Sequence, residues 1–598
     1  MVERPFVIQN IAPARFQRWK GYVMKPSTND RSGDLPYLVR RSLSEGLDLS
    51  EIPDAWVDAV VTGQGSRTGL RQAMKAWNHS RPLALIRFDA DRIGGYVFES
   101  YSPPILCGAS ELLKGLNEHI QNHPHFGRYV VFSSGGEGLL LVPNPLGSTL
   151  PETICSQIEK LFAETTASAL SVTTTFLEVS PLDFVGEPAT LRSEGDYRLV
   201  SGTQALMARL QDQLRSLKNR SGMNAPPVMG KVARCKSCGL RAGEVEVTEK
   251  YEGSLCGPCH RRYVVGARSI RGVSVNDLLD PEDSLGGKPQ YIGFIYADGN
   301  AMGRFFGKLE CLREIRDAAL AVAELFEKVD QRVKSYFAHQ KGEERAGNSL
   351  PLSLLGGGDE KIWMLPAEMA VDVCCQIPAW LTDHTSSTLR GLLRRNGIEG
   401  LSVGIGLVLC NSKYPVRYQY DLARSLQASA KRRYYAQPDA CISALDFEVV
   451  TNDGFFGHDF DATRNMATRT ADPHFFGTNR PYTLDEFGQC IDMVRHGLSK
   501  LSKSQLVGLQ KGTADGKDVF LNYACYQIAR NRSSYSALFE ARGFDREGFA
   551  DLESFLVSRQ PHLGENAWGT WVGDVVQLLP FLTNEATRKG VNHGPARH

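Results

Sequence analysis

The sequence lacks any long apolar run. No stretch reaches the roughly 18 residues that a membrane-spanning helix needs. The first segment, Met1 to Phe16, mixes charged and apolar side chains and has no apolar core of the kind found in a signal peptide. These absences argue against a membrane-embedded or secreted protein. We therefore expect a cytoplasmic protein without a membrane partner.

The sequence also has little net charge. Its 68 lysines and arginines nearly balance 67 aspartates and glutamates, which leaves +1 at pH 7. No global field then attracts nucleic acid, so any contact with RNA must come from local basic patches. The hydrophobic content of 42% and charged content of 23% are ordinary for a globular protein. A chain of 598 residues predicts about four units, each with its own core.

Cysteine is scattered except in two tight pairs. Four of the 13 cysteines follow the spacing Cys-x2-Cys-x17-Cys-x2-Cys. Four thiolates complete the tetrahedral shell of a Zn²⁺ ion and leave no open position, so we expect a structural rather than a catalytic zinc. A redox dithiol is the alternative. The expected ligands are Cys235, Cys238, Cys256 and Cys259.

Basic residues surround these cysteines in the sequence. They suggest a surface patch that faces RNA, and the alternative is an ordinary solvated basic face. The residues concerned are Lys231, Arg234, Lys236, Arg241, Arg261, Arg262, Arg268 and Arg271.

One order of elements occurs twice, about 200 residues apart. Each time an apolar strand ends in an acidic residue, a helix follows, and two strands then flank a tight glycine-rich turn. The first copy has strands 83–88, 129–132 and 139–142, and the second has strands 291–296, 351–355 and 361–365. The repeat predicts two α/β domains. The expected organisation is an N-terminal region of unclear fold at 1–80, a first domain at 81–220, a zinc module at 228–275, a second domain at 285–450 and a helical C-terminal domain at 480–598.

Acidic residues end the first strand and occupy the turn of the second copy. Asp298 ends the strand, and Asp359 and Glu360 lie in the turn about 60 residues later. These carboxylates would converge at one sheet edge and hold two Mg²⁺ or Mn²⁺ ions about 4 Å apart. One ion would activate a ribose hydroxyl, and the other would neutralise a triphosphate. Alternatively, Asp298 caps a helix and the turn is only a turn, but the two motifs together favour catalysis.

Further residues of the second copy suit a nucleotide. Glycines in the turn allow a sharp bend and a close approach of the ligand. The loop after Asp298 opens a helix whose N–H groups would bind phosphate. Lys431 is a candidate for the γ-phosphate, and the alternative for it is a solvated helix face. The expected nucleotide-binding residues are Gly299, Asn300, Gly303, Gly357, Gly358 and Lys431.

The first copy has fewer acids in its turn. Asp89 and Asp91 occupy the strand end, but the turn carries one acid, Glu137, where the second copy has two. A two-metal site would be incomplete there, so we expect a degenerate domain that does not catalyse.

The order of these motifs resembles the large polymerase-like subunit of type III CRISPR effector complexes, from about residue 83 to the C-terminus. Phe88 to Gly94 looks like the start of its first palm domain, and Asp298 to Gly303 like the strand-end motif of its second. Gly357 to Glu360 stands where that family has Gly-Gly-Asp-Asp, and Leu422 to Lys431 resembles its helix near the nucleotide.

This resemblance implies two ferredoxin-like palm domains, similar to GGDEF cyclases, that convert ATP into cyclic oligoadenylates when target RNA binds. It also implies a ribonucleoprotein complex in which other subunits bring guide and target RNA. Two features depart from the family. The first 80 residues contain His79 but no His-Asp pair, so we expect no HD-type nuclease, and Glu360 replaces an aspartate.

Two other functions compete with a cyclic oligoadenylate synthase. The chain would be a catalytically silent scaffold if its role were to bind guide RNA and small subunits through its C-terminal domain. It would be a cyclic-dinucleotide synthase if it used GTP, because the sequence does not fix the base.

Overall fold

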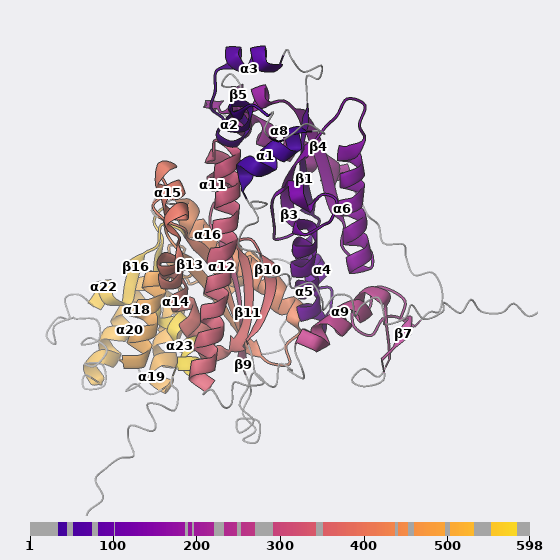
Figure 1. Cartoon of the computed structure of the whole chain (residues 1–598). Coiled ribbons are helices and arrows are strands. Elements are labelled where there is room, and N and C mark those ends of the chain that lie inside the picture. The colour runs from indigo at the N-terminus through magenta and orange to yellow at the C-terminus, as the bar shows by residue number, and fades with distance from the viewer. Residues whose placement is uncertain are drawn as a thin grey trace, which may run out of the picture.

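The structure of the chain is a computed structural model (Figure 1). It describes residues 34–44, 49, 52–74, 82–100, 102–185, 189–193, 196–220, 233–247, 253–269, 291–341, 351–436, 441–451, 460–496, 503–531 and 552–582. Over these residues, no helix is both long and apolar enough to cross a membrane.

The first α/β unit begins with a strand that is buried on nearly every residue. Such burial explains why the sequence of β1 reads as a continuous apolar run instead of alternating. Its sheet is antiparallel with the order β2-β3-β1-β4, and helices connect β1 to β2 and β3 to β4. The elements are β1 (Leu83–Ala90), α4 (Ile93–Val97), α5 (Pro103–Gln121), η5 (Gly127–Tyr129), β2 (Val130–Ser134), β3 (Glu137–Pro143), α6 (Leu150–Thr166) and β4 (Val172–Val179).

The second α/β unit repeats this order and extends it. Its sheet runs β10-β11-β9-β12-β13-β15, so β10-β11-β9-β12 corresponds to β2-β3-β1-β4 of the first unit. The repeat of element order predicted from the sequence is therefore present. The elements are β9 (Tyr291–Gly299), α11 (Met302–Lys308), α12 (Leu312–Lys341), β10 (Leu352–Gly357), β11 (Glu360–Pro366), α14 (Ala367–His384), α15 (Ser387–Arg395), β12 (Val403–Asn411), α16 (Val416–Ala436) and β13 (Ala444–Val450).

Segments on either side complete the first unit. Three N-terminal helices precede it, and the Ser42 hydroxyl donates a hydrogen bond to the Leu141 carbonyl of β3 at 2.7 Å. A short hairpin and a long helix follow it, and the cysteine module comes next. These elements are α1 (Leu35–Ser44), α2 (Asp54–Thr62), α3 (Arg67–Met74), α7 (Pro181–Phe184), β5 (Ala189–Ser193), β6 (Asp196–Val200), α8 (Gly202–Arg220), β7 (Val245–Glu246), β8 (Ser254–Leu255) and α9 (Gly257–Ser269).

The C-terminal region is less uniformly helical than the sequence predicts. A three-stranded sheet, β14-β17-β16, lies among its helices, and residues 557–559, expected to be helical, form β16. These strands have two or three residues, too few to show an alternating pattern. The elements are α17 (Phe460–Thr468), β14 (Phe475–Phe476), β15 (Tyr482–Thr483), α18 (Leu484–His496), α19 (Lys503–Gly512), η8 (Thr513–Asp515), α20 (Lys517–Arg530), α22 (Leu552–Leu556), β16 (Val557–Arg559), β17 (Trp568–Thr570) and α23 (Val572–Leu582).

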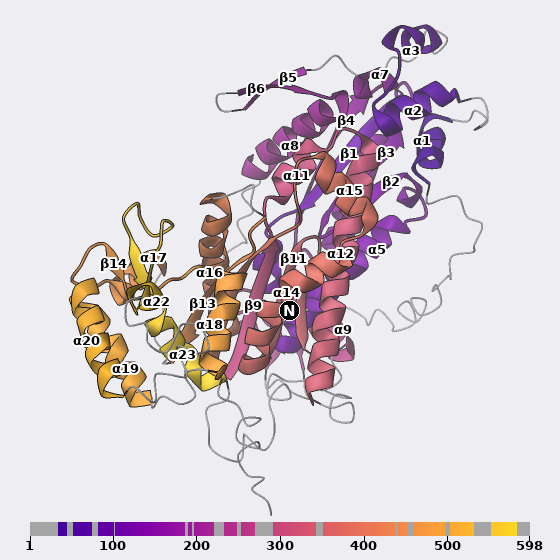
Figure 2. The same ribbon diagram turned by 90° about the vertical axis from the view of Figure 1, so that its left-hand side faces the viewer.

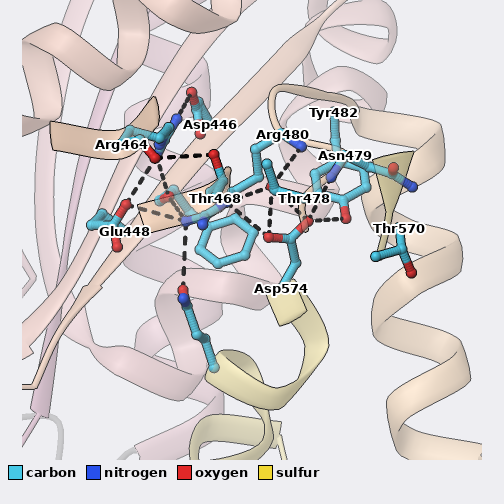
Figure 3. Close-up of polar contacts among 12 residues, drawn as sticks. Asp446, Glu448, Arg464, Thr468, Thr478, Asn479, Arg480, Tyr482, Thr570 and Asp574 are labelled. Carbon is cyan, nitrogen blue, oxygen red and sulfur yellow. Dashed lines mark hydrogen bonds and ion pairs between the residues drawn. The ribbon is translucent and has the colours of Figure 1, made fainter. Parts of the chain in front are cut away.

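A buried polar network joins the C-terminal region to the second sheet (Figure 3). Asp446 and Glu448 come from β13, and Arg464 of α17 forms ion pairs with both. The Arg480 guanidinium lies 3.2 Å from Glu448 Oε2 and 2.9 Å from Asp574 Oδ1. Each of these charges is buried, and a buried charge is tolerated only when paired and hydrogen-bonded. The C-terminal region therefore supplies the cations that β13 requires. In Figure 2 it lies on the side of the second unit away from the first.

Candidate active site in the second unit

The three predicted acids lie at one edge of the second sheet. Asp298 at the end of β9 is directly opposite Glu360 at the start of β11, so both side chains project from the same face. The turn before Glu360 folds against the end of β9, because the Gly299 amide donates a hydrogen bond to the Asp359 carbonyl at 3.2 Å. The strand end and the turn thus bring the three residues together, as the sequence predicts.

The electrostatics of this edge suit a cation. Burial and the neighbouring Asp298 carboxylate raise the pKa of Asp359 to about 7. Burial also raises the pKa of Glu360, and a hydrogen bond from Tyr296 partly offsets that increase. Repulsion between carboxylates is what a bound divalent ion relieves, and oxygen ligands are those that Mg²⁺ prefers. Asp298 and Asp359 therefore have the chemistry expected of metal ligands.

The Glu360 carboxylate has a partner of its own. Its Oε1 accepts a hydrogen bond from the hydroxyl of Tyr296, two residues before Asp298 on β9. Among the described residues, only the four cysteines form a set of three or more metal-ligating side chains whose ligand atoms all lie within 4.8 Å of one another. The backbone therefore brings the three acids to one edge, but their three carboxylates do not all converge within that distance.

Lys431 reaches into this site from α16. Its Nζ lies 2.5 Å from Asp298 Oδ2 and donates a hydrogen bond to the Gly299 carbonyl at 3.2 Å. Gln427, one turn earlier, donates to the same Oδ2 at 3.0 Å. The alternative of a solvated helix face is therefore wrong for Lys431. This cation is paired with the Asp298 carboxylate.

Two glycines of β12 explain how the helix comes so close to the strand. A Cβ atom on Gly404 would lie 2.8 Å from Lys431 Cγ, and one on Gly406 would lie 2.0 Å from the carbonyl oxygen of Ala423 on α16. Any side chain at either position would push the helix away. Glycines inside a strand, such as Gly404 and Gly406, indicate a close approach of another backbone. This signal was not recognised from the sequence.

The loop after Asp298 is only partly available to a ligand. The Gly299 amide is bonded to the Asp359 carbonyl, and the Asn300 amide donates to the Ser402 carbonyl at 2.8 Å. The buried Asn300 side chain donates to Ser402 Oγ at 3.0 Å and to the Ile442 carbonyl at 3.1 Å. These two amides do not face a phosphate, contrary to expectation, because they fasten the loop to the sheet.

The remaining expected glycines leave open space. Gly303 on α11 is exposed, and a Cβ atom there would meet no atom within 4 Å. Gly358 has φ of +68°, the left-handed region that favours glycine, and its surroundings are equally open. Gly357 forms the last pair of β10 with Glu360. The turn is therefore built for a sharp bend beside unfilled space.

A cavity opens beside the loop. It is small, and Arg304 on α11 and Lys308 one turn later bring cationic side chains to its lining. Asn300, Ser402 and Cys441 line it as well, so it adjoins the strand end that carries Asp298. Its position places two cationic side chains near the carboxylates.

The first unit keeps much of the same arrangement. Asp89 is directly opposite Glu137, as Asp298 is opposite Glu360. Lys218 of α8 lies 2.7 Å from Asp89 Oδ2 and donates to the Ala90 carbonyl at 3.3 Å, which repeats the contacts of Lys431. Gly136 stands in the turn where the second unit has Asp359. The acid at that position is therefore missing. Lys218 was not recognised from the sequence.

The four predicted zinc ligands form one buried cluster. Their sulfur atoms all lie within 4.8 Å of one another, and those of Cys238 and Cys256 are 3.8 Å apart. One pair lies in a turn, and the other lies at the start of α9. This set fits a structural zinc ion, as its spacing predicts.

Two of the basic residues around the cluster do not belong to a surface patch. Arg262 is fully buried, and its guanidinium lies 2.7 Å from the Glu99 carboxylate and over the Tyr96 ring. Arg241 pairs with the same glutamate at 2.8 Å. These arginines fasten the module to the first unit instead of facing RNA. Arg234 and Lys236 are exposed, whereas Lys231 and Arg271 lie outside the described residues.

The buried Asp359 carboxylate lies beside another acid, so removing its charge is expected to stabilise the metal-free protein. In the metal-free protein at pH 8, Asp359→Asn is expected to raise the melting temperature by a few degrees. The folded-state pKa of about 7 exceeds the ordinary value of 3.8, so the carboxyl favours folding below pH 3.8 and this contribution is lost as the pH rises through 7. Such a shift corresponds to at most roughly 4 kcal/mol, reduced by solvent screening.

Differential scanning fluorimetry at pH 5 and pH 8 checks this expectation. The gain should shrink at pH 5, where Asp359 is already protonated, and saturating Mg²⁺ should abolish it at pH 8. An equal change in melting temperature at both pH values would contradict the electrostatic cause.

Comparison with known proteins gives matches among solved structures. No protein-family model and no curated protein matches the chain. A Csm1–Csm4 cassette in complex with cA3 is 13% identical over 89% of this chain and 72% of its own, with a TM-score of 0.48. Csm1 in T.onnurineus is 14% identical over 86% of this chain and 72% of its own, with a TM-score of 0.49.

A third match is the Csm1–Csm4 subcomplex in the type III-A CRISPR-Csm interference complex, which is 13% identical over 84% of this chain and 70% of its own, with a TM-score of 0.47. The structural neighbours are Csm1 proteins. The sequence motifs resemble a subunit of the same class of complex.

Proposed function

We propose that the second unit is a palm-type nucleotidyltransferase that makes cyclic oligoadenylates from ATP, within a type III CRISPR effector complex activated by target RNA. The observation that carries the proposal is the meeting of Asp298, Asp359 and Lys431 at one sheet edge. Acidic residues on a strand end and in an adjacent turn, together with one cation, are what a metal-bound triphosphate requires.

The acidic residues would bind the metal ions, and the basic residues would bind the phosphates. Asp298 and Asp359 would hold the divalent ions, and Glu360 would be the third acid once it leaves Tyr296. Bound ions would neutralise the triphosphate and lower the pKa of the attacking hydroxyl. Lys431 would exchange its contact with Asp298 for the γ-phosphate, and Arg304 would add positive charge beside the same strand end. The zinc module would be structural, and guide and target RNA would come with other subunits.

One incubation separates this function from its rivals. The purified protein is mixed with ATP or GTP and Mg²⁺ or Mn²⁺, with and without the guide and target RNA of its complex, and the products are identified by mass. Cyclic oligoadenylates from ATP support the proposal. Cyclic dinucleotides from GTP would support the second candidate, and no product under any condition would support a scaffold.

Lys431 should contribute mainly to nucleotide binding. Lys431→Ala is expected to raise the KM for ATP about tenfold or more and to lower kcat by a smaller factor, because the lost cation contacts a group that is charged before and during the reaction. Steady-state kinetics at saturating Mg²⁺ measure both constants. Lys413→Ala, an exposed lysine at the far end of β12, is the matched control. A loss confined to kcat would contradict a binding role.

A further inference from the structure

Tyr296 stands between the acidic turn and the first unit. It is 6% exposed and lies two residues before Asp298 on β9, so the two side chains share one face of the sheet. Glu360 is opposite Asp298, which makes Tyr296 its diagonal neighbour across the two strands. The Glu360 carboxylate can therefore reach either the proposed metal site beside Asp298 or the phenol of Tyr296. In the structure it bonds to the phenol.

The phenol is the donor in this hydrogen bond. A tyrosine hydroxyl has a proton to donate, whereas an ionised carboxylate only accepts. A hydrogen bond to a charged acceptor is stronger than one between neutral groups. Glutamate has the extra methylene that lets a carboxylate lean along the strand toward Tyr296, and an aspartate at this position would be shorter.

Tyr296 packs against Tyr420 of α16, which in turn stacks on an aromatic ring of the first unit. The Tyr420 ring of α16 meets the Tyr296 ring edge-on at 5.9 Å, and it stacks on Phe98 of the first unit at 4.0 Å with an interplanar angle of 11°. Gly94 makes this contact possible, because a Cβ atom there would lie 2.0 Å from the Tyr420 hydroxyl. Phe98, Tyr420 and Tyr296 are all buried, which limits their freedom to move.

We propose that Tyr296 is a positioning residue that holds the Glu360 carboxylate at its phenol until a divalent ion competes for it. The stack of Tyr420 on Phe98 keeps the phenol in place, so the first unit sets how readily Glu360 is released. This inference rests on the proposed metal site at Asp298 and Asp359. It gives the first unit a part in metal binding that requires no catalysis there.

Mn²⁺ binding to the purified protein without nucleotide tests the inference. The probe is Mn²⁺ alone, with free ion measured by electron paramagnetic resonance, and the part of the binding that Asp359→Ala abolishes defines the site. Tyr296→Phe is expected to tighten binding at that site about tenfold, because Glu360 no longer has to leave a charge-assisted hydrogen bond. Phe98→Ala should act in the same direction with a smaller factor.

The variants have matched controls. Tyr336→Phe removes another tyrosine-to-carboxylate hydrogen bond of the second unit, to Asp372 at 2.9 Å, and should leave Mn²⁺ affinity unchanged. In a Glu360→Ala background, Tyr296→Phe should have no further effect, whereas a merely structural tyrosine would still change affinity. Melting temperature and zinc content show that each variant is folded.

The outcomes separate the two proposals. Unchanged or weaker Mn²⁺ binding in a folded Tyr296→Phe variant would overturn the positioning role, and so would tightening that persists without Glu360. If Asp298→Ala and Asp359→Ala leave Mn²⁺ binding as in the wild type, the proposed metal site itself fails.

Discussion

Replacing Asp298 or Asp359 with alanine is expected to abolish nucleotide polymerisation by the proposed synthase. Each substitution removes a carboxylate from the sheet edge where burial, together with repulsion between acids, raises the pKa of Asp359. Positioning and charge neutralisation supply most of the catalysis in phosphoryl transfer, so we expect a loss of at least about a hundredfold. The double variant should be scarcely slower than either single one, since ligands of one metal site act as a unit. Product formation from labelled ATP measures all three rates.

The first unit offers the control for this experiment. Glu137 occupies the register position that corresponds to Glu360, but Gly136 stands where Asp359 would be needed. Glu137→Ala should therefore leave synthesis within a few-fold of wild type. Folded Asp298→Ala and Asp359→Ala proteins that form product at the wild-type rate would show that the site lies elsewhere, and a large loss from Glu137→Ala would show that the first unit takes part in the chemistry.

Zinc removal is expected to have the second largest effect, on stability. Cys235→Ser or Cys256→Ser leaves three thiolates around the ion, and structural zinc sites contribute on the order of 10 kcal/mol to the folding of the segment that binds them. The module is also closely packed against the first unit, since a Cβ atom on Gly108 of α5 would lie 1.9 Å from the Arg262 carbonyl of α9. Loss of the ion should therefore lower the melting temperature by several degrees or more.

Metal analysis by mass spectrometry, together with thermal unfolding, checks this prediction. The wild type should contain one zinc per chain, and each variant should contain less. Cys525→Ser is the matched control, because Cys525 is exposed and outside the cluster. Pure protein that contains no zinc, or a Cys235→Ser variant with normal melting temperature and metal content, would contradict a structural zinc site.

Much of the fold could be predicted because its signals are local. The apolar run of β1 and β9, the acid that ends each strand and the glycine-rich turns all lie within a few residues of one another. The spacing of the two cysteine pairs is itself typical of a tetrahedral zinc site. The repeat of element order therefore emerged from the sequence, and so did the positions of Asp298, Asp359 and the four sulfur ligands.

The rest depends on contacts between residues that are distant in the sequence. Nothing near Arg262 indicates that its guanidinium is buried against Glu99, so a basic run was read as a surface. The contact between Glu360 and Tyr296 requires the register of β9 and β11, which no local pattern supplies. Lys218 was missed because nothing in the sequence aligns α8 with α16. Its correspondence to Lys431 appears only when the two units are compared in space.

The charges on β13 bear on how this chain can be divided. Asp446 and Glu448 lie inside an otherwise apolar strand, and their cationic partners, Arg464 and Arg480, come from the region that follows. A fragment that ends at Val450 would retain the whole acidic edge but lose both arginines that pair with these carboxylates. Removing one partner of a buried ion pair costs about 3–5 kcal/mol. The second unit therefore depends on the C-terminal region for its ion pairs, and the two regions belong in one fragment.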